Sequence, residues 1–285
     1  MSTAPDRKQI VITGASDGLG AESASQLAAQ GHDLVLSGRS PAKLAAVVER
    51  IRTESPQVQV QSFACDFADL DAVRTLAADV LAASPRIDVL LNNAGTIFMK
   101  RSTTKQGYES TFAVNHLAPF LLTELLVDRV VASGAGRIVN TSSTMHYRGS
   151  VDFDDLAFEH GYSGMKAYGR SKLATVAYTR DLSARLEGTG VTVNALHPGA
   201  VATSIYAVGP APVAKAVKGL AGLVMMSAAK GGATLTRLAT GEDVAGRTGG
   251  YYETFKLKAP NKRALDDAFV AQLDRVSRTM VGLTS

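Results

Sequence analysis

The sequence predicts one α/β domain in which helices cover both faces of a doubly wound, mostly parallel sheet of seven strands. Short β-branched runs alternate with longer helical patterns along almost the whole chain, as in parallel strands joined by right-handed helical crossovers. Several strand candidates are apolar nearly throughout, as expected where both faces of a sheet are covered. No repeat or linker divides the 285 residues, so we expect a single domain over 1–285.

The elements follow in regular order. Each strand candidate is a short run rich in β-branched or other apolar residues, and these runs lie at 9–13, 33–37, 58–63, 87–92, 137–142, 191–197 and 249–254. The helical patterns lie at 19–30, 41–54, 69–84, 105–133, 165–187, 227–240 and 262–281. Two connections, 144–164 and 204–226, are unusually long. The second is apolar, so we expect it to be a substrate lid beside a cofactor-binding core at about 7–200.

Composition excludes several classes of function. The net charge of +4 is spread over predicted helices, with one basic cluster at 256–263, so we expect no nucleic-acid partner. The single cysteine, Cys65, fits a reducing compartment. The N-terminal residues lack a signal-peptide pattern and Glu124 interrupts the longest apolar stretch, so we expect a cytoplasmic protein without a membrane span. The five histidines lack metal-ligand spacing, so no metal is expected.

A glycine-rich turn, "TGASDGLG", joins the first strand to the first helix. Its glycines permit a tight turn and the close approach of a pyrophosphate, and the helix N-terminus adds free N–H groups. A glycine trio alone also serves ordinary turns. Its place after the first strand of an alternating chain nevertheless indicates a dinucleotide-binding (Rossmann) fold. The candidate phosphate-binding residues are Gly14, Ser16, Asp17, Gly18, Leu19 and Gly20.

Two Tyr-x-x-x-Lys pairs, Tyr162 with Lys166 and Tyr168 with Lys172, are candidates for proton transfer. The two tyrosines are six positions apart, so on one continuous helix they would point roughly 120° away from each other. Two glycines beside the first pair disfavour regular helix there. The second pair lies in a good helical pattern, which places its members one turn apart on one face. Tyr168 is therefore the catalytic candidate, and Tyr162 is expected in a loop or a substrate pocket.

The second pair has the chemistry that proton transfer needs. A tyrosine hydroxyl is a weak acid near neutral pH, and a neighbouring ammonium favours its ionised form. Lys172 would supply that charge to Tyr168.

Several motifs in order resemble a short-chain dehydrogenase/reductase, from Val11 to about Gly282. They are the glycine-rich turn, "NNAG" at 92–95, Asn115 in "VNHLAPF", Ser143 in "NTSS", "YGRSK" at 168–172 and "HPGAVAT" at 197–203. The resemblance implies an oxidoreductase that uses a nicotinamide cofactor.

The resemblance also implies catalytic roles. Ser143 would bind the substrate oxygen, with Ser142 as the fallback, and Tyr168 would transfer the proton. Lys172 would also hold the nicotinamide ribose. Asn115 would support the lysine through a water in a proton relay, although a helix-bending polar residue is the other interpretation of this position.

Further positions would hold the cofactor by the same resemblance. Asp66 would accept a hydrogen bond from the adenine amino group, and the "NAG" backbone would lie against the adenosine ribose. Segment 197–203 would clamp the nicotinamide, with its histidine, like His146, in a supporting place. The implied cofactor-binding residues, besides Tyr168, Lys172 and the glycine-rich turn, are Arg39, Ser40, Asp66, Phe67, Asn93, Ala94, Gly95, Pro198, Gly199, Val201 and Thr203.

The second strand ends in "SGRS", without the acidic residue that selects NAD. The guanidinium of Arg39 can bind a 2′-phosphate in bidentate fashion, so we expect NADP(H). Ser40 and Pro41 also fit the N-cap and first position of the following helix, and both interpretations can hold together.

The insert between Ser143 and Tyr168 resembles retinol-dehydrogenase-like members of the family, which handle apolar alcohols, aldehydes or ketones. We therefore expect an NADP(H)-dependent oxidoreductase with an apolar alcohol or carbonyl substrate. The alternative is a non-catalytic NADP(H)-binding regulatory or scaffold protein of the same fold. In this family the helices at 105–133 and 165–187 often pack across a two-fold axis, which allows a homodimer or homotetramer. Pocket candidates, each of which also fits plain core packing, are Tyr147, Phe153, Phe158, Tyr162, Tyr206, Met225 and Met226.

Overall fold

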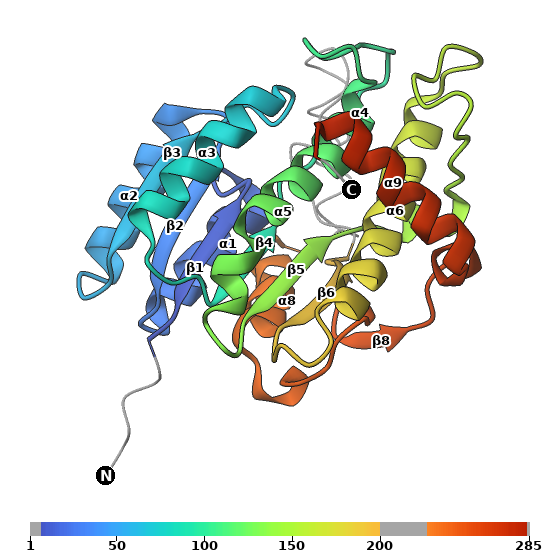
Figure 1. The fold of residues 1–285 in the computed structure, drawn as a ribbon. Coiled ribbons are helices and arrows are strands. Elements are labelled where there is room, and N and C mark those ends of the chain that lie inside the picture. Colours follow the sequence, from blue (N-terminus) through green and yellow to red (C-terminus); the bar gives the residue numbers. More distant parts are fainter. Residues whose placement is uncertain (1–6, 200–226, 284–285) are drawn as a thin grey trace.

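An eight-stranded sheet forms the centre of the computed structural model, which describes residues 7–199 and 227–283 (Figure 1). Its strand order is β3-β2-β1-β4-β5-β6-β7-β8, and every pair is parallel except β7 with β8. The order reverses between β1 and β4, which confirms the doubly wound topology and opens a crevice at that point. The strands are β1 Gln9–Thr13, β2 Asp33–Gly38, β3 Val60–Ala64, β4 Val89–Asn92, β5 Arg137–Thr141, β6 Thr192–His197, β7 Tyr251–Glu253 and β8 Lys256–Lys258.

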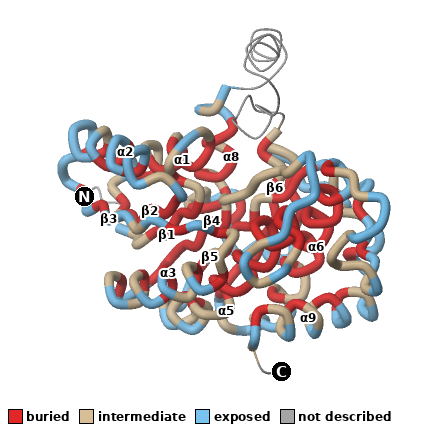
Figure 2. Tube along the Cα trace, turned by 90° about the horizontal axis from the view of Figure 1, so that it is seen from above, coloured by how far each residue is buried: buried red, intermediate tan, exposed pale blue. Residues whose placement is uncertain are grey.

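Helices cover both faces of this sheet. In Figure 2, α1, α2 and α8 lie on one side of the strands, and α3, α5 and α9 lie on the other. The longer helices are α1 Gly18–Ala29, α2 Pro41–Glu54, α3 Leu70–Ala83, α5 Ala118–Val131, α6 Gly164–Arg185, α8 Ala228–Thr240 and α9 Asp267–Val281. The short turns are α4 Ser110–Phe112, the π-turn Ala113–Leu117, and the 3₁₀ turns Thr144–Arg148, Glu242–Val244 and Lys262–Leu265.

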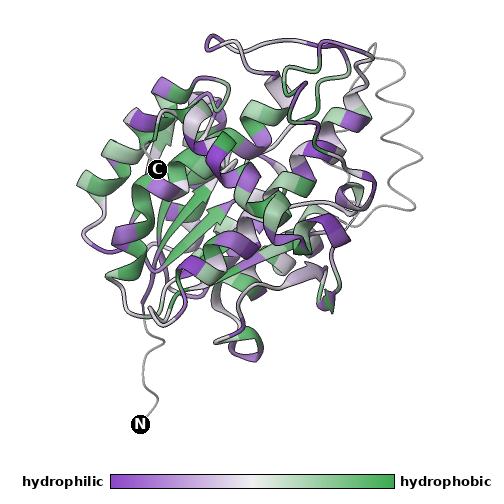
Figure 3. Ribbon diagram, turned by 45° about the vertical axis from the view of Figure 1, so that its right-hand side comes forward, coloured by the Kyte–Doolittle hydropathy of each residue, from purple (hydrophilic) through white to green (hydrophobic). Residues whose placement is uncertain are grey.

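The apolar strands feed two cores. Ile10 and Ile12 of β1 point into the core beneath α1, α2 and α8, while Val11 between them points into the core beneath α3, α5 and α6. All three side chains are fully buried. Figure 3 shows the hydrophobic strands inside and hydrophilic residues on the outer faces of the helices. This confirms the interpretation of unbroken apolar runs as strands covered on both faces.

Helix starts follow the capping signals. Ser40 accepts a hydrogen bond from the Lys43 backbone N–H, and Pro41 is the first residue of α2, so the N-cap interpretation is confirmed. Asp17 caps α1 by accepting from Gly18 N at 2.8 Å. Both caps lie at the carboxyl edge of the sheet.

The helix predicted at 105–133 begins five residues later. Residues 104–108 form a turn in which Gly107 has a φ of +84°, and Thr103 pairs with Glu109 across it. The Glu109 carboxylate then accepts from Thr111 N and Phe112 N, which starts the helix at this point. The prediction was wrong at this end: Lys105 and Gln106 favour a helix, but Gly107 is a poor helix former and closes the turn.

The C-terminal part adds details that the prediction missed. A short antiparallel strand, β8, pairs with β7 through Tyr251 with Lys258, which makes eight strands and not the predicted seven. Its three residues are exposed and carry no apolar pattern. The helix predicted at 262–281 starts only at Asp267, because Asp266 caps it after a separate 3₁₀ turn.

Helix α9 packs against α6 and also reaches the neighbouring elements. The Ser277 hydroxyl lies 2.8 Å from His116 Nε2 in the π-turn, and Arg278 pairs with Glu124 of α5 at 2.8 Å. Tyr108 donates a hydrogen bond to the carbonyl of Met280. Helix α9 of the same chain therefore contacts both α5 and α6.

The stretch Ser110–Val131, which contains the apolar run that Glu124 interrupts, is by length and composition able to cross a membrane. However, 78% of its most apolar window is buried inside the structure. Its apolar residues therefore serve the core. The expected lid at 204–226, with Tyr206, Met225 and Met226, lies outside the described residues, as do Val201 and Thr203.

Candidate active site

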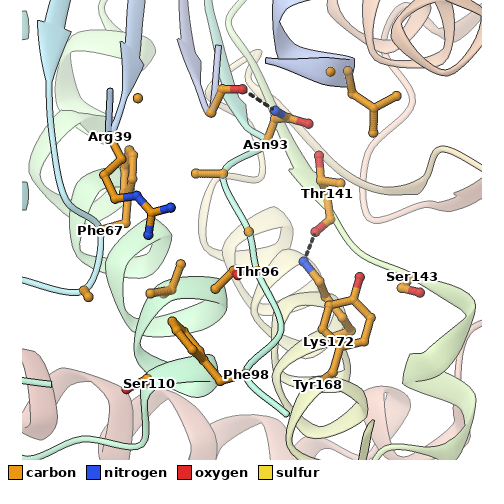
Figure 4. A pocket seen from close by; sticks show the side chains of 18 of the residues that line it. Arg39, Phe67, Asn93, Thr96, Phe98, Ser110, Thr141, Ser143, Tyr168 and Lys172 are labelled. Atoms are coloured by element: carbon orange, nitrogen blue, oxygen red, sulfur yellow. Dashed lines mark hydrogen bonds between the residues drawn. The ribbon is translucent and has the colours of Figure 1, made fainter. Parts of the chain in front are cut away.

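A cavity of about 590 Å³ opens at the carboxyl ends of the strands, where the strand order reverses (Figure 4). Figure 4 shows Arg39 and Phe67 at one end and Ser143, Tyr168 and Lys172 at the other. The predicted site residues that line it are Gly14, Ser16, Asp17, Gly18, Leu19, Arg39, Asp66, Phe67, Asn93, Ala94, Gly95, Ser143, Tyr168, Lys172, Pro198 and Gly199.

The glycine-rich turn has the tight geometry that a dinucleotide requires. Gly14 has a φ of +66°, and a Cβ there would lie 2.8 Å from Ala94 Cα. A Cβ on Gly20 would lie 2.3 Å from the Gly14 carbonyl oxygen. Asn93 Nδ2 donates to the carbonyls of Thr13 and Gly14 at 3.1 and 3.3 Å, which ties β4 to the turn. The turn and the N-terminus of α1 therefore fit a pyrophosphate.

The end of the cavity that contains Arg39 carries positive charge. Arg39 is exposed at the end of β2 and lines the cavity, together with Asp66 and Phe67 after β3. Lys43 Nζ lies 2.8 Å from Asp17 Oδ2, so the acidic side chain of the turn is paired with a cation. An exposed guanidinium in this place fits a phosphate group.

Tyr168 and Lys172 lie one turn apart on α6 and both face the cavity. Lys172 Nζ donates a hydrogen bond to the Thr141 carbonyl at 2.8 Å and lies 5.5 Å from the centre of the Tyr168 ring. The lysine is 3% exposed, and this burial lowers the pKa of its ammonium to about 8. The ammonium is thus held beside the phenol in a largely dry place.

Tyr162 is positioned quite differently. Its hydroxyl donates to the Phe98 carbonyl at 2.6 Å, and it is not among the residues that line the cavity. Burial raises the pKa of this phenol above its ordinary value. Helix α6 begins at Gly164, after Tyr162, as the glycines predicted. Of the two pairs, only Tyr168 with Lys172 faces the cavity.

The two candidate serines point to different partners. Ser142 donates its hydroxyl hydrogen to the Lys172 carbonyl at 3.0 Å and is thereby turned toward α6. Ser143 Oγ accepts the Met145 N–H at 3.2 Å, so its own hydrogen remains available as a donor. Both line the cavity, but the Ser143 hydroxyl is the one suited to a ligand oxygen.

Asn115 lies in the π-turn and is 2% exposed. Its side chain exchanges two hydrogen bonds of 2.8 Å with the Thr96 backbone and donates a third to Ser171 Oγ at 3.0 Å. A methyl group on Gly95 would lie 3.3 Å from Asn115 Oδ1 and 3.4 Å from Lys172 Nζ. The asparagine thus holds the cavity wall next to the lysine, and the water-borne proton relay stays a prediction.

Comparison with known proteins decides the family. A model of the short chain dehydrogenase family matches residues 8–209. Human retinol dehydrogenase 13 is 38% identical over 281 residues, which cover 97% of this chain and 85% of that protein.

The chain belongs to the short-chain dehydrogenase family.

Other relatives agree with this assignment. Human retinol dehydrogenase 14 is 36% identical and covers 97% of this chain and 87% of its own length, so the chain falls in the retinol-dehydrogenase-like subgroup. A crystal structure of an uncharacterised protein from Mycobacterium paratuberculosis superposes with a TM-score of 0.77 at 28% identity, covering 97% of this chain and 94% of that one. A short chain dehydrogenase from Shigella flexneri complexed with NADP has a TM-score of 0.69 at 25% identity, covering 90% and 100%.

Some predicted residues of this dehydrogenase lie away from the cavity surface. Gly20 packs beneath the turn, and Ser40 caps α2. The suggested pocket residues Tyr147, Phe153 and Phe158 also do not line it: Tyr147 binds Glu253, Phe153 packs on Phe269, and Phe158 lies under Arg170.

Other residues line the cavity without having been assigned to the site from the sequence. They are Gly38, Ala68, Thr96, Phe98, Ser102, Thr103, Thr104, Ser110, Val114, Thr141 and His197. Thr96 and Phe98 directly follow "NNAG", which was a usable signal, whereas 102–104 carry none. Within residues 7–199 and 227–283, no three histidine, cysteine or acidic side chains cluster as metal ligands.

Proposed function

We propose that this dehydrogenase is an NADP(H)-dependent oxidoreductase that interconverts an apolar alcohol and its ketone or aldehyde. The observation that carries the proposal is the convergence of Ser143, Tyr168 and Lys172 on the cavity that also contains the glycine-rich turn and Arg39. One end thus fits a phosphorylated cofactor, and the other offers groups for a reacting oxygen.

The bound nicotinamide would supply or accept a hydride at the carbon that carries the reacting oxygen. In reduction, the Ser143 hydroxyl donates a hydrogen bond to that oxygen, because a carbonyl oxygen can only accept and the contact from Met145 N–H leaves the hydroxyl hydrogen available. Tyr168 gives its phenolic proton to the same oxygen as negative charge develops there. In oxidation, the ionised Tyr168 takes that proton back.

Lys172 supports this transfer by its charge. With a pKa lowered to about 8, the ammonium is the predominant form at neutral pH, and its hydrogen bond to the Thr141 carbonyl fixes its place. Negative charge on the Tyr168 oxygen is stabilised by this nearby cation, more strongly than in water because the site is buried.

The charge at the end of the cavity that contains Arg39 supports a preference for NADP(H). Arg39 can bind a 2′-phosphate, and the end of β2 lacks the acidic residue that would bind the ribose hydroxyls of NAD. Lys43 neutralises Asp17, the one carboxylate of the turn, and so removes its repulsion of the phosphate. The Shigella flexneri relative complexed with NADP supports the same choice.

An apolar substrate is supported by two observations. The apolar side chains of Phe98 and Val114 line the cavity. The curated relatives with high identity are named retinol dehydrogenases, and a retinol is an apolar alcohol. We propose an apolar alcohol or carbonyl compound as the substrate class.

The test follows nicotinamide absorbance with a panel of apolar aldehydes and ketones, using wild type, Tyr168→Phe and the matched control Tyr162→Phe. We expect Tyr168→Phe to lose turnover by about 10²-fold or more while its affinity for NADPH stays nearly unchanged. Tyr162→Phe should keep kcat, because its hydroxyl binds a backbone carbonyl away from the cavity. The reverse ranking would refute the assignment of the proton donor.

A second arm compares NADPH with NADH in wild type and Arg39→Ala. We expect wild type to prefer NADPH and Arg39→Ala to lose about tenfold or more in kcat/KM for NADPH only, because one charge-assisted contact to phosphate is removed. Equal losses with both cofactors would contradict the phosphate-binding role. Tight NADPH binding without turnover of any compound would favour the regulatory alternative.

A further inference from the structure

We propose that His146 is a positioning residue for the catalytic serine, held in its working tautomer by Asn261 from the C-terminal part of the chain. The inference rests on the proposed function, because it concerns how Ser143 is placed to bind the reacting oxygen. It is carried by hydrogen bonds to both ring nitrogens of a fully buried imidazole.

The hydrogen bonds determine where the imidazole carries its proton. His146 Nδ1 lies 2.7 Å from the Ser143 carbonyl oxygen, which can only accept, so Nδ1 must carry the hydrogen. Nε2 lies 3.2 Å from the backbone N–H of Asn261, which can only donate, so Nε2 must be unprotonated. The ring is therefore neutral with its proton on Nδ1. Burial also lowers the pKa of this imidazole, which favours the neutral form.

Ser143 is restrained at each end by this arrangement. Its carbonyl receives both the ring Nδ1–H and the backbone N–H of His146, the latter at 3.0 Å. Its hydroxyl receives Met145 N–H at 3.2 Å. With the carbonyl held twice, rotation of the Ser143 backbone is restricted, and the hydroxyl stays aimed at the cavity.

Asn261 and the β7–β8 hairpin brace the same turn from behind. Asn261 Nδ2 donates to the carbonyls of His146 and Tyr147 at 3.0 and 3.1 Å, and the Tyr147 hydroxyl donates to Glu253 at 2.8 Å. The rings of His146 and Tyr251 lie 4.4 Å apart. This brace therefore joins the serine turn to β7.

The brace also reaches the part of the cavity wall that follows β6. Thr254 N donates to the carbonyl of His197 at 2.7 Å, directly before Pro198 and Gly199 of the cavity wall. Through β7, the serine and this wall are therefore held in register with each other. Such registration matters because a displacement of about 1 Å at a reacting group can cost about 10²-fold in rate.

Two substitutions separate the halves of the imidazole. Asparagine places an amide nitrogen near the position of Nδ1, so His146→Asn keeps the donor to the Ser143 carbonyl and loses the acceptor for Asn261. Glutamine places its amide near the position of Nε2, so His146→Gln does the opposite. We expect His146→Gln to lower kcat by about tenfold or more with KM for NADPH unchanged, and His146→Asn to keep most of kcat. Similar losses of kcat in both variants would overturn the proposal.

Tyr147→Phe is the matched control, because it removes the hydroxyl contacts of Tyr147 with Glu253 and with the Ala259 carbonyl without touching Ser143. It should keep kcat near wild type. Melting temperatures of all variants show whether a loss follows stability instead: a kcat that falls in parallel with Tm across the series would mean a merely structural role and would overturn the proposal.

The decisive comparison is a double-mutant cycle with Ser143→Ala. If His146 acts through the serine hydroxyl, His146→Gln has little further effect on kcat once that hydroxyl is absent. A full additional loss in the double variant would show that the histidine acts elsewhere.

A measurement without turnover separates this proposal from the proposed function. In wild type with ¹⁵N-labelled histidine, we expect NMR to show a neutral His146 with a slowly exchanging Nδ1–H. A proton on Nε2 would overturn the positioning proposal even if the enzyme is active. If the enzyme turns over no carbonyl compound, the proposed function fails, and the catalytic part of this inference fails with it, whatever the tautomer.

Discussion

Arg170 provides a test of how the insert before α6 is held. Its guanidinium is 2% exposed and lies 3.7 Å from the Glu109 carboxylate, which is 0% exposed. It also donates to the carbonyls of Asp155 and Leu156 at 2.9 and 3.0 Å, and lies 4.4 Å from the centre of the Phe158 ring. Arg170→Met removes the charge and these contacts, and keeps much of the aliphatic volume.

The expected loss can be worked from the distance. Two unit charges 3.7 Å apart attract by about 4–5 kcal/mol at an effective dielectric constant of about 20. Part of this is returned, since Arg170 no longer has to be desolvated, and Glu109 keeps the N–H groups of Thr111 and Phe112 as donors. Breaking a buried pair by removing one partner typically costs about 3–5 kcal/mol. We therefore expect Arg170→Met to lower Tm by about 10 °C.

Thermal unfolding followed by circular dichroism measures this loss, with Lys105→Met as the control. Lys105 lies 3.0 Å from Asp71, but the two side chains are 67% and 68% exposed, so its removal should leave Tm nearly unchanged. The double variant Arg170→Met/Glu109→Gln should regain stability over Arg170→Met, because no unpaired charge remains buried. A loss in Arg170→Met no larger than in Lys105→Met would refute the reasoning.

Three further outcomes are expected. Lys172→Met should lose turnover yet exceed wild type in stability by up to about 3 kcal/mol at neutral pH, since it removes a buried charge. Between about pH 8 and pH 10.4, Lys172 keeps its proton in the unfolded wild type but loses it in the folded wild type, so wild-type stability rises with pH. In urea titrations over this range, the stability advantage of Lys172→Met over wild type should therefore shrink. Gly20→Ala should weaken NADPH binding at least about tenfold by fluorescence titration, since its Cβ would lie 2.3 Å from the Gly14 carbonyl; an unchanged Kd would contradict this clash. Lys43→Ala should raise KM for NADPH about fivefold, since it frees Asp17 to repel the phosphates of the cofactor; an unchanged KM in steady-state kinetics would count against it.

Local sequence signals were sufficient for the main fold and for much of the candidate site. Helix α2 has the predicted bounds because Ser40 and Pro41 mark its start unambiguously. Tyr168 could be separated from Tyr162 because Gly161 and Gly164 flank Tyr162 where the helical pattern has not yet begun, and α6 starts only at Gly164. In both cases the physical cause lies within a few residues of the feature itself.

Features that depend on distant contacts were not predictable. The contact between His146 and Asn261 joins residues 115 positions apart, and neither residue carries a local sign of it. The turn at 104–108 is stabilised by pairing of Thr103 with Glu109, which overrides helix-forming residues between them. Strand β8 exists only because β7 offers it an edge.

The way α9 is fastened has a consequence for how the chain reaches its folded state. Its contacts to Arg74, Tyr108 and His116 join residues 161 to 207 positions apart. During synthesis, α3 and the π-turn that carries Asn115 must therefore wait for residues 277–281 before their surroundings are complete. Long-range closure of this kind slows folding and prolongs the exposure of apolar surface. Enzymatic activity should consequently appear later than the sheet forms, and only after the chain has been synthesised as far as Val281.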